Sequence, residues 1–341
     1  MKTRRTLLQA LSALALSKTV PAWAQSLQGT VRVGYVPVIG ASALFVLDGA
    51  GWAREAGLAI KTTKFESGPN AIQALASGTL DALAIGVAPV AVARAKGLDV
   101  KIVAAGATGG SAFMASPELA EAFAVNDGRP ARAFAAFRAR QRRPAKLATL
   151  PPAGVPTVAL HHWLWKVAQV DRADVTIAQM GIEAVQQAML AGAVDGGTVL
   201  EPSATLVTER NPRLRRIVNA PEMFPDIPGV VFAITRQFEV SNPGGVETLV
   251  RLLVRATDLL KTEPSAAAPF VQAVLGGGLV DTATIARAIA SPAVSYVADP
   301  RAIVRATEAM LSYQVELGDF PTAPPIAGLF DPAYYAHAAT P

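Results

Sequence analysis

The sequence contains no cysteine among its 341 residues. Disulfide bonds, thiolate metal sites, cysteine nucleophiles and an anchor on a lipid-modified N-terminal cysteine are therefore excluded. Only three histidines are present, no predicted loop pairs a nucleophile with a base, and no phosphate-binding glycine motif occurs. We predict a protein that is not an enzyme, with no catalytic residue, no metal site and no cofactor.

Charged residues are also few, at 17% of the chain, and the formal net charge is +5. Four basic residues, Lys2, Arg4, Arg5 and Lys18, lie within the first 24 positions, which contain no acid. The rest of the chain therefore carries only +1. Because a nearly neutral protein lacks the attraction that nucleic acids and anionic membranes exert on basic partners, we predict no nucleic-acid partner.

The first 24 residues have the pattern of a secretory signal peptide. Basic residues precede an apolar run at 7–16, and residues 22–24 form a small-x-small cleavage site. The run has about half of the roughly 20 residues that a transmembrane helix needs, so we expect cleavage to leave Gln25 first. Arg4 and Arg5 fit the twin-arginine export pattern and equally an ordinary basic segment. Either route predicts a periplasmic protein.

Short apolar runs alternate with helical patterns from residue 31 to residue 202. Strands are predicted at 31–35, 59–65, 80–85, 100–105, 146–150, 175–178 and 194–199. Helices are predicted within 41–56, at 69–77, near 89–96, at 156–168 and at 182–191, with a short helix after Pro202. This alternation is typical of mainly parallel sheets with helices on both faces. A strand at 230–234 and helices at 246–261, 266–275, 282–290 and 301–316 are predicted to follow.

Residues 74–82 and 188–196 share one pattern at a separation of 114 positions. In each copy a helix ends at a glycine, Gly78 or Gly192, that takes the left-handed conformation. An aspartate, Asp81 or Asp195, then opens the next strand. One copy alone is a generic turn between a helix and a strand, whereas two copies in the same relative place predict two similar lobes.

Residues 117–146 contain six arginines interleaved with Phe134 and Phe137. Two phenylalanines three residues apart fall on one face of a helix. We interpret this segment as a solvated helix with an apolar face rather than as a nucleic-acid surface. The predicted helix at 156–168 carries adjacent histidines, and its buried stripe is expected to include Val167 and to leave His162 facing outward.

Several short motifs occur in a characteristic order. In the first half they are Val-Arg-Val-Gly-Tyr at 31–35, Ser-Gly-Pro-Asn at 67–70 and Gly-Thr-Leu-Asp-Ala at 78–82, and in the second half Asp-Val at 174–175, Gly-Ala-Val-Asp-Gly at 192–196 and Glu-Pro at 201–202. In this order the chain resembles the substrate-binding proteins of ABC importers, in the group that binds nitrate, sulfonates, taurine and thiamine precursors. The arginine-rich segment ending at 143–146 replaces the usual Leu, Gly and Lys lead-in of that group.

The resemblance implies a periplasmic-binding-protein type II fold, with two α/β lobes joined by two crossover strands and a helical C-terminal tail. We accordingly divide the chain into a signal peptide at 1–24, the first part of lobe I at 25–108, lobe II at 109–230, and a return to lobe I with C-terminal helices at 231–341. The crossing strands are expected near 103–107 and 230–234.

The same resemblance implies a monomer that captures a small, sulfonate-like organic anion between its lobes. It would deliver this ligand to a permease and ATPase complex in the inner membrane. The alternatives are a protein that binds a pyrimidine precursor of thiamine and an enzyme of the same fold.

Ligands of open α/β sheets bind beyond the carboxyl ends of the strands, so the loops after the strands form the predicted site. The predicted ligand contacts are Tyr35, Pro37, Ile39, Ser42, Ser67, Gly68, Asn70, Ala88, Thr108, Gly109, Ser111, Gly154, Val155, Thr157 and Glu201. Because these loops contain no Lys or Arg, amides at helix N-termini and hydroxyl groups are expected to hold an anion. Tyr35 is equally explained as a core residue, Ser42 and Ser67 also as helix caps, and Glu201 chiefly as a cap.

Overall fold

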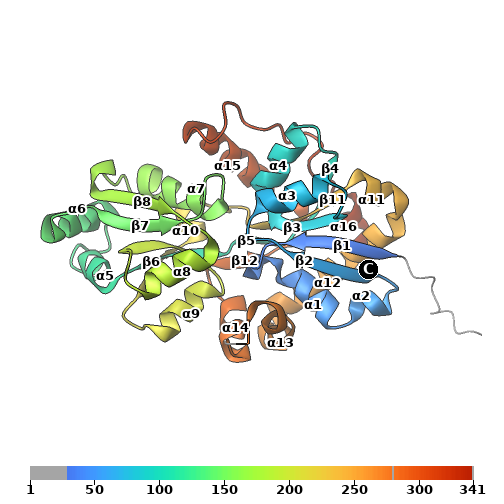
Figure 1. Cartoon of the computed structure of the whole chain (residues 1–341), viewed down its shortest axis with the longest axis horizontal. Coiled ribbons are helices and arrows are strands. Elements are labelled where there is room, and N and C mark those ends of the chain that lie inside the picture. The colour runs from blue at the N-terminus through green and yellow to red at the C-terminus, as the bar shows by residue number, and fades with distance from the viewer. Residues whose placement is uncertain (1–28, 279, 340–341) are drawn as a thin grey trace, which may run out of the picture.

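The computed structural model describes residues 29–278 and 280–339. The predicted signal peptide and the predicted new N-terminus at Gln25 lie outside the described residues. Two five-stranded sheets, each flanked by helices, lie side by side and are joined by a short two-stranded sheet (Figure 1). No helix in the described ranges is long and apolar enough to cross a membrane.

The first sheet has the order β2-β1-β3-β11-β4. Its strands are β1 (Thr30–Tyr35), β2 (Ala59–Lys64), β3 (Ala82–Gly86), β4 (Val100–Ala105) and β11 (Val230–Thr235). Strand β1 is parallel to β2 and β3, whereas β11 is antiparallel to β3 and β4. The helices between these strands are α1 (Ser42–Gly49), α2 (Trp52–Glu55), α3 (Gly68–Ala76) and α4 (Val87–Ala95), with a 3₁₀ turn η1 (Ile39–Ala41) before α1. This is lobe I.

The second sheet has the order β10-β6-β9-β7-β8. Its strands are β6 (Ser111–Ala115), β7 (Ala145–Thr149), β8 (Val175–Gln179), β9 (Gly196–Leu200) and β10 (Arg215–Asn219). The helices are α5 (Pro117–Ala124), α6 (Pro130–Gln141), α7 (Val155–His162), α8 (Ile182–Leu190), α9 (Ser203–Arg210) and α10 (Ala220–Met223), with short turns η2 (Trp163–Val167) and η3 (Arg172–Asp174). This is lobe II.

The two lobes repeat one design. Strand β7 is parallel to β8 and β9, as β1 is to β2 and β3, and an antiparallel strand follows β9 in the sheet as β11 follows β3. In lobe I the Asp81 carboxylate accepts the backbone N–H of Arg32 at 2.8 Å, and in lobe II the Asp195 carboxylate accepts that of Lys146 at 2.7 Å. Each pair of positions is 114 residues from its counterpart, which confirms the internal repeat.

The chain passes between the lobes as a narrow ribbon. Strand β5 (Ala107–Gly109) pairs with β12 (Val294–Tyr296), and backbone bonds join Gly109 to Ile227 and Gly229 to Ala107 at 2.8 and 2.9 Å. The expected crossing segments at 103–107 and 230–234 lie instead almost entirely within the first sheet, in β4 and β11. The crossing occurs at 106–110 and 224–229, after α10, because β4 and β11 pair with each other up to Ala105 and Val231.

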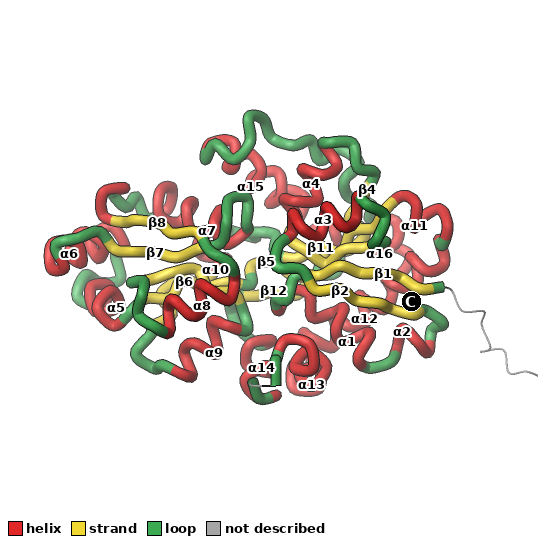
Figure 2. Tube along the Cα trace, viewed as in Figure 1, coloured by secondary structure: helices red, strands yellow, loops and turns green. Residues whose placement is uncertain are grey.

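The helical tail covers lobe I and also reaches lobe II (Figure 2). It comprises α11 (Arg236–Ser241), α12 (Pro243–Thr262), α13 (Pro264–Leu275), α14 (Thr282–Ile289), α15 (Val304–Glu316) and α16 (Ala333–Ala338), with a 3₁₀ turn η4 (Pro300–Ile303) before α15. Helix α12 packs on α1, α14 contacts α9 of lobe II, and α15 contacts both α4 and α7. The tail therefore joins the two lobes along two sides of the crossing ribbon.

The arginine-rich segment is a surface helix of lobe II, as predicted. Helix α6 buries Phe134 and Phe137 in the core, while Arg138 pairs with Asp174 and Arg140 with Glu121, at 3.2 and 2.9 Å. The arginines thus hold α6 to its own lobe.

The helix predicted at 156–168 consists of α7 and a π turn, η2. The wider π turn rotates Val167 into solvent, where it is 54% exposed, so the prediction that Val167 is buried was wrong. The prediction that His162 faces outward was also wrong. Its Nδ1 lies 2.8 Å from the Met223 carbonyl and its ring packs on Phe224, because α10 covers this side of α7.

Candidate functional site

A cavity of about 270 Å³ lies between the lobes, at the carboxyl ends of all six parallel strands. A ligand at this edge meets the loops after β1, β2 and β3 from one side and the loops after β7, β8 and β9 from the other. The lining residues are Val36, Val38, Gly40, Glu66, Ser67, Gly68, Pro69, Gly86, Pro89, Gly109, Gly110, Leu150, Pro151, Pro152, Ala153, Gly154, Val155, Pro156, Gly181, Ile182, Leu200, Gly229 and Val230.

The cavity inherits the repeat of the chain. Six pairs of lining residues stand 114 positions apart, one member in each lobe: Val36 and Leu150, Val38 and Pro152, Gly40 and Gly154, Ser67 and Gly181, Gly68 and Ile182, Gly86 and Leu200. The two lobes therefore present corresponding loops to the same space.

Four helices begin at this cavity, two from each lobe. Their N-cap residues are Ser67 for α3, Gly86 for α4, Gly154 for α7 and Gly181 for α8, and all four line the cavity. No side chain caps α4, α7 or α8. Since each helix N-terminus carries about half a positive charge and free N–H groups, the cavity offers partial positive charge from four directions.

The side chains around the cavity are mostly apolar. Glycine, alanine, proline and aliphatic residues make up the lining except for Glu66 and Ser67, and no Lys, Arg or His contributes to it. Groups of three His, Cys, Asp or Glu side chains that could share a metal ion are absent from residues 29–278 and 280–339. The cavity can thus enclose an apolar ligand body and hold a polar group by backbone amides.

The structure brings five of the predicted ligand contacts to the cavity, namely Ser67, Gly68, Gly109, Gly154 and Val155. The other ten lie behind or beside the lining: Tyr35, Pro37, Ile39, Ser42, Asn70, Ala88, Thr108, Ser111, Thr157 and Glu201. Most of these ten belong to the same loops as lining residues.

Tyr35, Ser42 and Ser111 are three of the predicted contacts that lie outside the cavity lining. Tyr35 packs edge to face on Phe45 with ring centroids 5.1 Å apart, and burial raises the pKa of its phenol. The Ser42 and Ser111 hydroxyls are buried without a hydrogen-bond partner among the described residues. Ser42 lies beside the Tyr296 phenol, and burial raises the pKa of Tyr296 far above its ordinary value.

Thr157 shapes the lobe II wall. Its hydroxyl donates to the Leu150 carbonyl at 2.7 Å, which ties the end of β7 to the first turn of α7. Behind it the Thr149 and Thr198 hydroxyls lie 2.6 Å apart. These bonds hold the loop at 150–154 in the position from which it lines the cavity.

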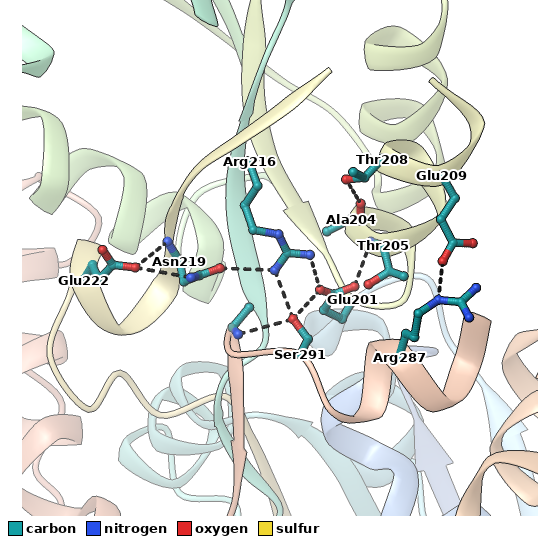
Figure 3. Close-up of polar contacts among 11 residues, drawn as sticks. Glu201, Ala204, Thr205, Thr208, Glu209, Arg216, Asn219, Glu222, Arg287 and Ser291 are labelled. Atoms are coloured by element: carbon teal, nitrogen blue, oxygen red, sulfur yellow. Dashed lines mark hydrogen bonds and ion pairs between the residues drawn. The ribbon is translucent and has the colours of Figure 1, made fainter. Parts of the chain in front are cut away.

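Glu201 is fully buried and joins both lobes at the crossing ribbon (Figure 3). Its carboxylate accepts Arg216 Nη2 at 2.6 Å, the Ser291 hydroxyl at 2.6 Å and the Thr205 N–H at 3.0 Å. The last bond caps α9, as the sequence favoured. Its backbone carbonyl accepts the Ile39 N–H at 3.1 Å, so Glu201 links lobe II to lobe I and to the tail.

Two charged contacts close the space between the lobes away from Glu201. On one side Arg287 of α14 donates to Glu209 of α9 at 2.7 Å, which lowers the pKa of Glu209. At the cavity mouth Lys64 of lobe I lies 3.5 Å from Glu183 of lobe II and 3.5 Å from Glu66. Burial opposes the charge on Lys64, but attraction by Glu66 and Glu183 prevails and raises its pKa.

We expect Glu183→Gln to weaken ligand binding by about 1.5- to 5-fold, because the lobes that enclose the ligand then lose the Lys64–Glu183 ion pair between them. Exposed pairs contribute about 0.2 to 1 kcal/mol, and 1.4 kcal/mol is about tenfold in affinity. Calorimetry at low and high salt checks this, since salt should remove the difference. Glu118→Gln, at an exposed acid of α5, is the matched control, and a loss that persists at high salt contradicts the expectation.

Most lining residues that are not among the fifteen predicted contacts still lie in the loops predicted after the strands, at 36–42, 66–70, 87–89, 108–111, 151–157, 179–182 and 200–202. Sequence reasoning missed these loops' neighbours Gly86 and Leu150, and it missed Gly229 and Val230. Gly86 and Leu150 are only one residue outside predicted loops. The expectation that ligands bind beyond the carboxyl ends of strands does not include Gly229 and Val230. Strand β11 is antiparallel to β3, so it brings its first residues to the cavity. Only the prediction of a returning crossover strand near 230 pointed to them.

Comparison with known proteins identifies the family of the chain. The sequence model of the NMT1-like family matches residues 24–275, which is more than half of the chain. No curated protein is similar in sequence.

Several solved structures share the fold. The periplasmic nitrate-binding protein NrtA from Synechocystis PCC 6803 superposes with a TM-score of 0.74 at 14% identity, covering 92% of this chain and 89% of that one. The zinc-bound ligand-binding component of an ABC-type import system from Staphylococcus aureus gives 0.72 at 14%, with 91% and 99% covered. The alkanesulfonate-binding protein SsuA from Xanthomonas axonopodis pv. citri, bound to MOPS, gives 0.67 at 17%, with 89% and 98% covered. At these identities the likeness concerns the fold, which is the two-lobed type II fold predicted above.

Proposed function

The chain belongs to the NMT1-like family, and on this premise we propose that it is the periplasmic substrate-binding component of an ABC importer. It captures a small organic anion between its lobes and delivers it to a membrane permease and its ATPase. The family, the two-lobed fold and the interlobe cavity support this role. The nitrate- and alkanesulfonate-binding proteins with the same fold support an anionic ligand.

One observation carries the ligand class: the N-termini of four helices converge from both lobes on an apolar cavity that has no basic side chain in its lining. Helix N-termini bind anions through free N–H groups and the helix dipole. Each hydrogen bond to a charged group contributes about 1.5 to 3 kcal/mol. Three or four such bonds are enough for micromolar binding, about −8 kcal/mol, after the cost of association.

The volume of the cavity limits the apolar part of the ligand. An engineered protein cavity of about 150 Å³ holds a benzene molecule, and this cavity has about 270 Å³. A substituted single ring or an alkyl chain of a few carbons therefore fits beside a sulfonate or carboxylate. The aliphatic and proline lining suits such a body better than it suits a bare inorganic ion.

A thermal-shift screen of the protein starting at Gln25 tests this proposal. Methanesulfonate, butanesulfonate, benzenesulfonate, the matching carboxylates, nitrate, and neutral and cationic pyrimidines are compared. A ligand at a hundredfold excess over its dissociation constant adds about 2.7 kcal/mol, or about 5 to 10 °C in Tm at 2 to 4 °C per kcal/mol. We expect this shift from an organic sulfonate or carboxylate. A shift from the cationic compounds alone would contradict an anionic ligand.

A further inference from the structure

The two lobes contribute different chemistry to the cavity. All ten lining residues of lobe II, from Leu150 to Leu200, are glycine, alanine, proline or aliphatic. The two lining residues with polar side chains, Glu66 and Ser67, both belong to lobe I. Resting on the proposed function, we infer that the ligand binds in one orientation, with its anionic head on lobe I and its apolar body under lobe II.

Because of the internal repeat, the two lobes can be compared at corresponding positions, 114 residues apart. Where lobe I has Val36, Gly68 and Gly86, the corresponding positions of lobe II have the larger Leu150, Ile182 and Leu200. Ser67 is the reverse case, since its counterpart is Gly181. At these corresponding positions lobe II therefore has larger aliphatic side chains, whereas lobe I has smaller residues and the Ser67 hydroxyl.

The space in lobe I lies at two helix N-termini that pack against each other. A Cβ at Gly68 would lie 2.7 Å from Pro89 of α4, so glycine there lets α3 and α4 begin close together. At Gly86 the backbone is an ordinary extended one, with φ −60° and ψ 150°, and a Cβ would lie 3.6 Å from Val155 across the cavity. Neither strain nor packing within lobe I requires this glycine, which leaves room for the ligand.

Glu66 is the one acid of the lining, and Lys64 lies 3.5 Å both from it and from Glu183. Because one lysine offsets two acids only in part, the positive charge for an anionic head on lobe I comes from the N-termini of α3 and α4. The Ser67 hydroxyl accepts the Asn70 N–H at 3.4 Å, a long bond that leaves its O–H free to donate to the ligand.

The test measures calorimetric affinity for methane-, butane- and hexanesulfonate. For the parent protein, affinity is expected to rise by about fourfold per methylene, corresponding to about 0.8 kcal/mol per buried CH₂. Ser67→Ala tests the contact of lobe I with the anionic head of the ligand, and Ile182→Ala tests the contact of lobe II with its apolar body. Ser116→Ala removes a serine cap from α5, and Ile177→Ala removes a half-buried isoleucine of lobe II outside the cavity; these two variants are the matched controls for folding.

With the head on lobe I, Ser67→Ala lowers affinity by about tenfold, and by the same factor for every chain length. Ile182→Ala leaves methanesulfonate binding nearly unchanged and lowers affinity by a factor that grows with chain length, to about tenfold for hexanesulfonate. An effect of Ile182→Ala that is equal at all lengths, or of Ser67→Ala that grows with length, overturns the inference while the proposed function stands. If neither the sulfonates nor the matching carboxylates bind the parent protein, the anionic ligand class fails, and the inference fails with it.

Discussion

Gly86→Leu is expected to weaken binding of an organic sulfonate by about 5- to 150-fold while the protein still folds. Gly86 lines the cavity, and a Cβ added there would lie 3.6 Å from Val155, so we expect the leucine side chain to take up space in the cavity. Overlap of a ligand with a filled site costs about 1 to 3 kcal/mol, and 1.4 kcal/mol is about tenfold. The counterpart of Gly86 in lobe II is Leu200, so the substitution makes the two walls alike at this position.

The backbone should tolerate the change, because φ at Gly86 suits any residue and the nearest atoms to an added Cβ are at 3.6 and 3.8 Å; thermal unfolding tests whether the fold also accommodates the outer three carbons of the leucine. Loss of glycine at the N-cap of α4 costs about 1 kcal/mol. Gly86→Ala is the control, since it loses the same cap preference but adds one carbon. Calorimetry and thermal unfolding separate the effects, and binding by Gly86→Leu as tight as in the parent contradicts the assignment of this cavity to the ligand.

Glu201→Ala is expected to lower the free energy of unfolding by about 3 kcal/mol. Removing one partner of a buried ion pair costs about 3 to 5 kcal/mol, because the other charge is left without compensation. We expect the lower end of this range of free energies because the Arg216 side chain is 23% exposed. The substitution also leaves the Ser291 hydroxyl and the Thr205 N–H without their acceptor.

Chemical denaturation measures this loss, with Glu222→Ala as the control. Glu222 belongs to the same region and accepts the Asn219 N–H at 3.2 Å, but it is a surface cap, so its removal should cost about 1 kcal/mol. Glu201→Gln should fall between the two, because an amide keeps one acceptor oxygen but loses the charge. Equal losses for Glu201→Ala and Glu222→Ala would show that the Glu201 pair does not stabilise the joint between the lobes.

Much of the architecture followed from local patterns. Sequence patterns of strand length predicted β1 to β4 and β7 to β9 within about two residues. Strands β3, β4 and β9 are buried along most of their length, as apolar runs predict, whereas the edge strands β2 and β8 are largely exposed. The repeated glycine and aspartate signal predicted two lobes, since Gly78 and Gly192 both have positive φ and Asp81 and Asp195 both bind the backbone of a neighbouring strand. The rule of strand carboxyl ends placed the loops of the cavity.

Individual side chains in those loops were harder to place. A loop of a few residues alternates between facing the cavity and facing its own lobe, so Ser67 lines the cavity while Ser42 is enclosed by protein. The assignment of the fifteen predicted contacts to a bound ligand stays a prediction. The arginine-rich segment was interpreted correctly as a surface helix because its phenylalanine spacing is a local property.

The sequence by itself therefore determined the α/β class, the doubled lobe, the loops that meet a ligand and the lack of basic side chains among them, since each depends on residues close together in the chain. Tertiary structure alone decided which residues act together across long separations. Glu201 meets Ser291 at a distance of 90 positions, Lys64 meets Glu183 at 119, and Val230 reaches the cavity on an antiparallel strand. No local periodicity encodes these pairings, because they arise only when the return of the chain and its helical tail bring the two lobes into one orientation.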